Sequence, residues 1–105
     1  MKHYVVEITY TAPLKRIEEI MPQHRAFLQT GYDCGWLLMS GPKNPRTGGI
    51  VVARAPSLEE IQSFFGLDPY QLNQVATYRF AEFSPVKRQP SMESWINGCA
   101  GIVQL

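Results

Sequence analysis

The chain has 105 residues, of which 45% are hydrophobic and 18% are charged, and its formal net charge is +1. This length and composition predict one globular domain with a single hydrophobic core. The Lys and Arg residues are scattered and form no stripe that could neutralise a phosphate backbone, so we expect no nucleic-acid binding. No apolar run is long enough to span a membrane, and no apolar leader precedes the first strand-like segment, which favours a cytoplasmic protein.

The two cysteines, Cys34 and Cys99, do not form a metal-binding motif. Two ligands are too few for a zinc site, so we expect no metal. A disulfide between them requires an oxidising compartment, and we expect free thiols in the cytoplasm. The sequence also lacks a phosphate-binding loop and the common hydrolase motifs, and we therefore expect no cofactor.

The first segment, Lys2–Tyr10, alternates with period two, and its even-numbered side chains share one face. This pattern predicts a β-strand. A helical segment follows over Leu14–Cys34, with an apolar stripe at positions 14, 17, 21 and 28. Pro22 interrupts this segment, and predicts either a kink or a second helix that begins there.

Two short apolar runs, Trp36–Ser40 and Ile50–Arg54, flank a loop rich in Gly and Pro and predict a β-hairpin. Ser57 opens a second helix with a Ser-Leu-Glu-Glu capping box, and Gly66 ends it. The aromatic run Ala76–Phe83 predicts the last strand. The order β-α-β-β-α-β indicates a ferredoxin-like α+β fold, in which helices cover one face of an antiparallel sheet.

The chain becomes polar and rich in proline after about residue 86. We expect residues 1–86 to form the domain and residues 87–105 to form a C-terminal extension. The extension carries apolar side chains that predict packing on a partner subunit or across the domain's own surface. These residues are Trp95, Ile96, Ile102, Val103 and Leu105.

His24 occupies a core-facing position of the first helical segment, where Leu or Ile would be ordinary. If a helix begins at Pro22, His24 lies in its first turn, where the positive end of the helix dipole favours a neutral imidazole. A neutral imidazole is a usable general base. The alternative is a structural histidine that bonds a nearby carbonyl or water.

Asp68 precedes Pro69, and this pair predicts the N-cap and the first position of a short helical turn. Capping alone explains the residue type. The functional alternative is a carboxylate that orients His24 or assists proton transfer. Ser40 could donate to a ligand and Gly41 would allow close backbone approach, although both also suit a simple turn.

Three further residues have less specific patterns. Tyr32 and Tyr70 could line a pocket, although aromatic residues more often serve packing. His3 lies on the first predicted strand with no evident partner, and we expect it to be exposed or at an interface.

Several short motifs resemble those of the YciI-like family, within the dimeric α+β barrel superfamily. The resemblance rests on the order and spacing of these motifs and covers roughly residues 2–86. They are the opening strand, His24 in the first helix, Ser40-Gly41-Pro42, the helix start at Ser57 and above all Asp68-Pro69-Tyr70. The resemblance implies a homodimer of ferredoxin-like subunits whose sheets face each other, and an active-site pair made of His24 and Asp68.

The resemblance also implies a function. The superfamily includes muconolactone isomerases, and some YciI-like proteins are linked to dehydrochlorination of hydroxylated aromatics. We therefore expect a small cofactor-independent isomerase, lyase or dehydrochlorinase that acts on a lactone or a hydroxylated aromatic, with His24 as general base. The substrate contacts would come from Ser40, Gly41, Tyr70 and Arg25.

The alternative is a non-catalytic dimer that binds a small ligand or serves as an accessory module. The chain also departs from the family at one position near the histidine. Many members carry an Arg three residues before it, where this sequence has Met21.

Overall fold

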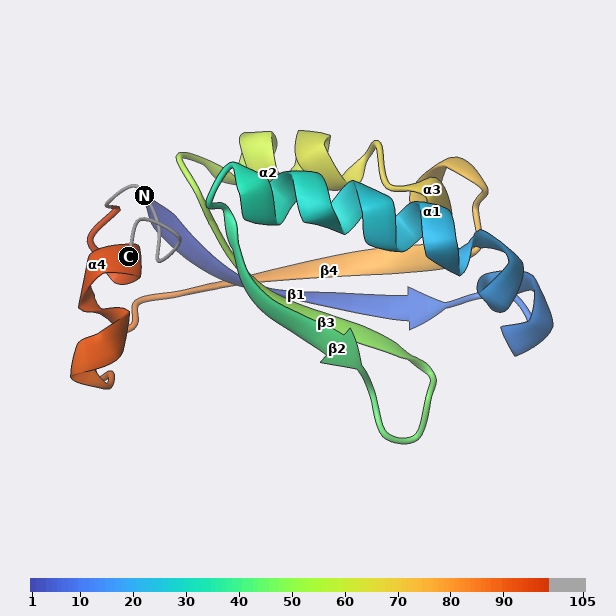
Figure 1. Ribbon diagram of the computed structural model, residues 1–105, viewed down its shortest axis with the longest axis horizontal. Coiled ribbons are helices and arrows are strands. Elements are labelled where there is room, and N and C mark those ends of the chain that lie inside the picture. The colour runs from blue at the N-terminus through green and yellow to red at the C-terminus, as the bar shows by residue number, and fades with distance from the viewer. Residues whose placement is uncertain (99–105) are drawn as a thin grey trace.

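The computed structural model describes residues 1–98, which form one layer of sheet and one layer of helices (Figure 1). Four strands make an antiparallel sheet in the order β2-β3-β1-β4. The strands are β1 (Lys2–Tyr10), β2 (Leu37–Pro42), β3 (Gly48–Ala55) and β4 (Ala76–Phe83). The helices α1 (Leu14–Asp33) and α2 (Leu58–Phe65) cover one face of this sheet, and the short helix α3 (Pro69–Leu72) precedes β4. This is the ferredoxin-like α+β fold that the sequence predicts.

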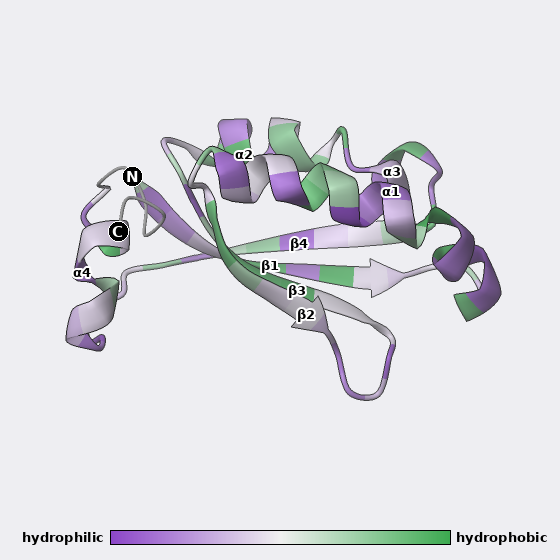
Figure 2. Ribbon diagram, in the orientation of Figure 1, coloured by the Kyte–Doolittle hydropathy of each residue, from purple (hydrophilic) through white to green (hydrophobic). Residues whose placement is uncertain are grey.

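The core lies between the sheet and the two longer helices. On β1, Tyr4, Val6 and Ile8 are buried and alternate with other side chains, as the period-two pattern predicts. Ile17 of α1 and Ile61 of α2 are fully buried in the same cluster. Figure 2 shows hydrophobic and hydrophilic bands alternating along α1, which is typical of a helix with one buried face.

The helix α1 is continuous through Pro22, so the predicted start of a second helix at this residue is wrong. Pro22 is exposed, and water can satisfy the Glu18 carbonyl that an N–H at position 22 would otherwise bond. His24 therefore lies in the middle of a 20-residue helix. The helix-dipole argument for its neutral form does not apply, because the dipole acts within the terminal turns.

The hairpin strands and the cap of α2 follow the sequence pattern with two differences. β3 extends beyond its predicted range at both ends, whereas β2 begins one residue and ends two residues later than predicted. The connecting loop shortens to residues 43–47. Ser57 caps α2 by accepting from the Glu60 backbone N–H at 3.2 Å. The Ser57 hydroxyl also donates to the Glu60 carboxylate at 3.1 Å, where the capping box predicts a bond from the Ser57 backbone.

The chain after β4 forms a 3₁₀ helix, η1 (Pro90–Met92), and a short helix, α4 (Glu93–Ile96), beside the start of β1 (Figure 1). Trp95 is 3% exposed, and its indole N–H donates to the Gly35 carbonyl at 3.1 Å. The Arg54 guanidinium lies over the indole ring at 5.1 Å and donates to the Trp95 carbonyl. This part of the extension thus packs on the domain's own surface. The boundary at residue 86 stays a prediction, and Cys99, Ile102, Val103 and Leu105 lie outside the described residues.

His3 is buried against this extension, so the first of the two expectations for it, that it is exposed, is wrong. The second, that it lies at an interface, stays a prediction. Its ring lies 5.6 Å from the Trp95 ring, measured between centroids. The contact joins the first strand to the extension after β4, and neither local sequence pattern contains a signal for it.

The burial of His3 leads to a prediction about pH. Burial, and then the positive charges of the N-terminus, Arg54 and Arg88, lower the pKa of His3 below 6.5. Above pH 6.5 the ring is neutral in both the folded and the unfolded chain, and its contribution to stability is complete. As the pH falls below 6.5 the unfolded chain takes up a proton first, so we expect stability to decrease. Thermal unfolding between pH 8 and pH 5 should show a smaller decrease for His3→Phe than for the wild type. Identical pH profiles would contradict this prediction.

Among residues 1–98, no helix combines the length and the hydrophobicity that crossing a lipid bilayer requires.

Candidate active site

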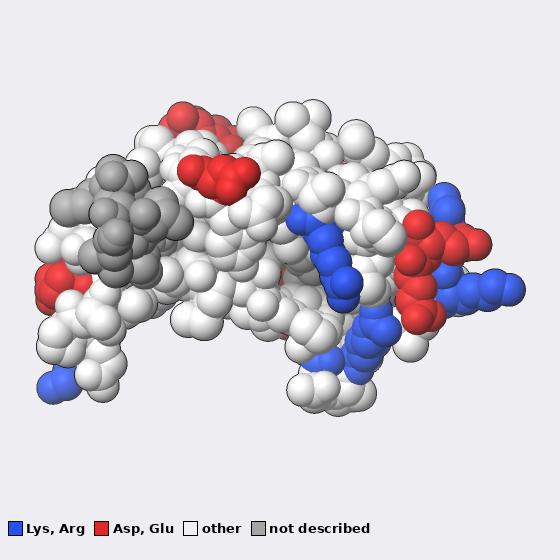
Figure 3. All heavy atoms as spheres, viewed as in Figure 1, with Lys and Arg blue, Asp and Glu red and all other residues white. Residues whose placement is uncertain are grey.

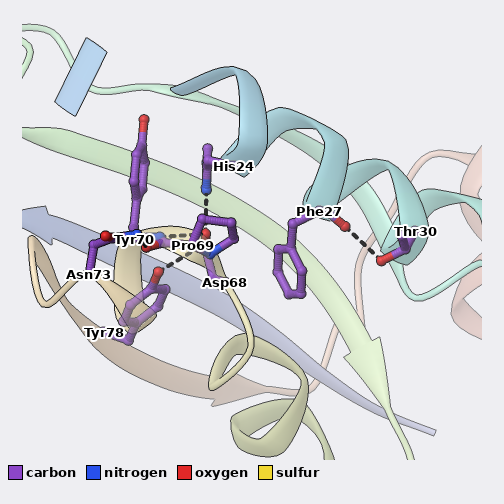
Figure 4. A network of polar contacts seen from close by, with 8 residues as sticks. All are labelled: His24, Phe27, Thr30, Asp68, Pro69, Tyr70, Asn73 and Tyr78. Atoms are coloured by element: carbon purple, nitrogen blue, oxygen red, sulfur yellow. Dashed lines mark hydrogen bonds and ion pairs between the residues drawn. The ribbon is translucent and has the colours of Figure 1, made fainter. Parts of the chain in front are cut away.

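His24 and Asp68 meet between α1 and the start of α3, although 44 positions separate them. The distance from His24 Nδ1 to Asp68 Oδ1 is 2.8 Å. His24 is 9% exposed and Asp68 is completely buried. The core-facing position on α1 directs the imidazole inward, and the cap position of α3 places the carboxylate opposite it (Figure 4). A direct hydrogen bond therefore joins the two residues.

The Asp68 carboxylate accepts three hydrogen bonds. Its Oδ1 accepts from the Tyr70 backbone N–H at 3.1 Å, which is the predicted N-cap bond, and also from His24. Its Oδ2 accepts from the Tyr78 hydroxyl at 2.6 Å (Figure 4). These donors supply the hydrogen bonds that a buried carboxylate requires. Capping α3 and bonding the imidazole are thus two roles of one side chain.

The bonds of Asp68 determine which nitrogen of His24 carries the proton. An ionised carboxylate only accepts hydrogen bonds, so Nδ1 is the protonated nitrogen and donates to Oδ1. In the neutral ring, Nε2 then keeps its lone pair. Within residues 1–98, Nε2 has no hydrogen-bond partner. This nitrogen is not fully buried, and His24 lines a cavity. The lone pair is therefore available to a bound molecule.

Tyr70 stacks on His24, with the ring centroids 3.9 Å apart and an angle of 12° between the ring planes. Burial, followed by the neighbouring Tyr10 and Asp68, raises the pKa of the Tyr70 phenol above its usual range. The ring therefore stays neutral at physiological pH. Its stacking restricts the rotation of the imidazole and helps to hold His24 toward Asp68.

Tyr78 is a site residue that the sequence did not indicate. It lies on β4 opposite Ile8 of β1, and this register turns it toward the helices and Asp68. Burial, and then the Asp68 carboxylate, raise the pKa of the Tyr78 phenol far above its usual range. The phenol therefore keeps its proton and donates a hydrogen bond to Asp68. An aromatic residue in a strand indicates only packing, and no motif distinguishes Tyr78 from the other aromatic residues of β4.

A cavity of about 550 Å³ lies between α1 and the β2–β3 hairpin. This volume is within the range of small-molecule sites. Of the residues that the sequence indicates, five line the cavity: His24, Arg25, Ser40, Gly41 and Tyr70. Asp68 is not among the lining residues and lies behind His24. The Ser40 hydroxyl bonds the Tyr32 hydroxyl at 2.6 Å, so Tyr32 reaches the site only through Ser40.

Two charged residues of the cavity were not indicated by the sequence. Arg46, from the loop between β2 and β3, and Glu18 of α1 both line it. The sequence around Arg46 indicates only a turn, and Glu18 lies on a helix with several exposed acids, so neither has a local signal.

Among the described residues, no cluster of His, Cys, Asp and Glu side chains could hold a metal ion.

The antiparallel sheet, the helices on one face and the cavity between the two layers place the molecule among the ferredoxin-like α+β proteins. The chain belongs to the family of YCII-related domains, whose model matches residues 1–84. This match confirms the family resemblance seen in the sequence. Comparison with curated proteins found no match.

Among solved structures, the chain is similar to 5-chloro-2-hydroxyhydroquinone dehydrochlorinase from Burkholderia phenoliruptrix, in complex with 2,5-dihydroxybenzoquinone. The TM-score is 0.66 and the sequence identity is 17% over 79% of this chain and 93% of that chain. At this identity the similarity shows a shared fold.

Proposed function

We propose that this protein is a small enzyme that catalyses proton transfer on a small organic molecule, as a lyase or isomerase that needs no cofactor. One observation carries the proposal. The bond from His24 Nδ1 to the buried Asp68 carboxylate leaves Nε2 as the free nitrogen of a residue that lines the cavity. An imidazole oriented by a carboxylate is a common form of general base.

In the proposed reaction, Nε2 takes a proton from a hydroxyl or an activated C–H group of the substrate. The Asp68 carboxylate stabilises the imidazolium that forms, while the Nδ1–H stays bonded to Oδ1. The Ser40 hydroxyl, or a backbone N–H close to Gly41, would stabilise negative charge that develops on a substrate oxygen. Arg25 and Tyr70 line the same cavity and would contact the substrate.

Two kinds of substrate fit this chemistry. In a chlorinated hydroxyaromatic, His24 would move one hydroxyl proton to the carbon that bears chlorine. Removal of a second hydroxyl proton would then expel chloride with the C–Cl electron pair, so that the net products are a quinone and HCl. In a lactone, a proton taken from one carbon would return to another, which moves the double bond. The similar fold of a dehydrochlorinase that binds a dihydroxyquinone supports the first kind.

The test is turnover of both kinds of substrate. The wild-type protein is incubated with 5-chloro-2-hydroxyhydroquinone, with chloride release as the readout, and with muconolactone, with absorbance as the readout. We expect turnover of at least one, and a rate about 10²- to 10⁴-fold lower for His24→Gln. Arg16→Gln, on the exposed start of α1, is the matched control and should keep the wild-type rate. Equal rates for His24→Gln and the wild type would refute the proposal. Binding of these compounds without turnover would favour the non-catalytic ligand-binding module.

We further propose that the protein acts as a homodimer in the cytoplasm. The sheet face away from α1 and α2 carries apolar side chains that stay exposed or half-buried, namely Val5, Met39, Val52, Ala81 and Phe83. Met39 and Phe83 are 57% and 43% exposed. A second copy of the same face would bury this patch. The exposed free thiol of Cys34 suits a reducing compartment.

This proposal predicts the effect of a charge at the centre of the patch. Val52 lies directly opposite Val5 of β1 and Met39 of β2. A lysine there would place an ammonium group in an apolar interface, so Val52→Lys should convert a dimer to a monomer in analytical ultracentrifugation. Ala26→Lys, on the exposed side of α1, is the control and should stay dimeric. A monomeric wild type, or a Val52→Lys variant that remains dimeric, would contradict the prediction.

A further inference from the structure

Arg46 is held at the cavity by a loop that β1 anchors. The neighbouring Thr47 carbonyl accepts from the Tyr10 backbone N–H at 2.9 Å. The next residue, Gly48, packs so closely on β1 that a Cβ there would collide with the Ile8 carbonyl oxygen. A glycine is therefore needed at this position, and it brings the loop against the strand that forms one wall of the cavity. Arg46 thus has a defined place at the site.

The Arg46 guanidinium has weak partners in the protein. Its Nη1 lies 4.0 Å from the Glu18 carboxylate, in a pair whose side chains are 36% and 60% exposed. Such exposed pairs contribute little to stability. Its Nη2 lies 3.7 Å from the Met21 sulfur, which is a poor acceptor. Most of the donor capacity of the guanidinium therefore remains for a ligand.

The cavity wall carries an excess of positive charge. Two guanidinium groups, of Arg25 and Arg46, and one carboxylate, of Glu18, line it. Arg25 makes no hydrogen bond or ion pair with any residue in the range 1–98. The Asp68 charge lies behind the wall, where three hydrogen bonds engage it. Figure 3 shows basic side chains on this face, between α1 and the tip of the β2–β3 loop.

Tyr70 lines the same cavity as Arg46 and His24. The Tyr70 ring stacks on the imidazole with centroids 3.9 Å apart, and meets the Tyr10 ring edge-on at 5.9 Å. Arg46 and Tyr70 both line the cavity, and the positive charge of Arg46 opposes the increase that burial causes in the pKa of the Tyr70 phenol. Arg46, Tyr70 and His24 therefore face the same cavity.

We propose that the substrate carries an anionic oxygen group, a carboxylate or an ionised enol or phenol, and that Arg46 binds this group. The guanidinium would donate two parallel hydrogen bonds to it. The atom that loses its proton to His24 would lie in the same cavity, which both residues line. Arg46 is then the residue that selects anionic over neutral substrates. This inference rests on the proposed function in taking the cavity as the substrate site.

The test compares two ligands of the same shape and different charge. Benzoate and benzamide are titrated into the protein at fixed ionic strength, and binding is followed by amide chemical shifts in NMR spectra. We expect benzoate to bind the wild type about tenfold more tightly than benzamide. Arg46→Gln should remove this preference and leave benzamide binding unchanged. Arg16→Gln, an arginine of α1 outside the cavity, is the control and should keep the preference.

Equal binding of the two ligands by the wild type, no binding of benzoate, or an unchanged preference in Arg46→Gln would overturn the inference. Arg46 is half-buried in a loop, and thermal unfolding of the variant verifies that it folds. Failure of this inference differs from failure of the proposed function. If Arg46→Gln leaves turnover unchanged, only the proposed role of Arg46 is refuted. If the protein prefers benzoate but turns over neither substrate, only the proposed catalytic function is refuted.

Discussion

Asp68→Ala should lower the free energy of unfolding by about 3–5 kcal/mol, because each buried donor that loses its acceptor costs about 1–3 kcal/mol. The substitution leaves three donors without an acceptor: His24 Nδ1, the Tyr70 backbone N–H and the Tyr78 hydroxyl. Asp68 is completely buried, so water cannot easily replace the carboxylate. Urea denaturation of the two proteins measures the difference.

Ser57→Ala is the matched control, because Ser57 caps α2 as Asp68 caps α3. Loss of an ordinary N-cap lowers the free energy of unfolding by about 1 kcal/mol. An Asp68→Ala effect equal to that of Ser57→Ala would mean that Asp68 is only a cap. A clearly larger effect is expected if Asp68 also holds His24 and Tyr78.

Asp68→Asn should lower the rate of proton transfer by about 10²- to 10³-fold while the protein stays folded. The Tyr70 N–H can only donate, so the amide oxygen of asparagine would occupy the Oδ1 position. This orientation keeps both the cap and the bond from His24. The Tyr78 hydroxyl can rotate to accept from the new amide group. The substitution therefore removes the negative charge and keeps the geometry.

The size of this effect follows from the charge that forms during the reaction. A carboxylate about 4 Å from a cation contributes about 4 kcal/mol at an effective dielectric constant of 20. The transition state realises part of this energy, because the proton is only partly transferred. The rate is measured with whichever substrate the wild type turns over, beside the unfolding curve of the variant. An unchanged rate would show that the Asp68 charge does not assist the base.

The order of helices and strands was predictable because each segment has a local pattern that agrees with its final environment. The period-two alternation of β1 and the capping box of α2 are examples, and both describe contacts between residues close in sequence. His24 was visible for the same reason, as a polar residue in an apolar helical stripe. Asp68 was visible as a cap, and the family resemblance added its pairing with His24.

The missed features depend on contacts between residues distant in sequence. Tyr78 reaches Asp68 only through the register of β4 on β1, and no rule for a single strand gives that register. Arg46 lies in a turn whose approach to the cavity depends on the packing of the loop on β1. The expectation of a second helix that begins at Pro22 was wrong, because a proline in an exposed helix position can be tolerated when tertiary packing holds the helix on both sides.

The most direct test of the central claim is the protonation state of His24, measured from the ¹⁵N chemical shifts of its ring in the neutral form. If Asp68 orients a general base, Nδ1 carries the proton and Nε2 shows the shift of a nitrogen with a free lone pair. The wild type should show this tautomer, and Asp68→Asn should keep it. A proton on Nε2 in the wild type would contradict the account, because the nitrogen available to the cavity could not then accept a proton.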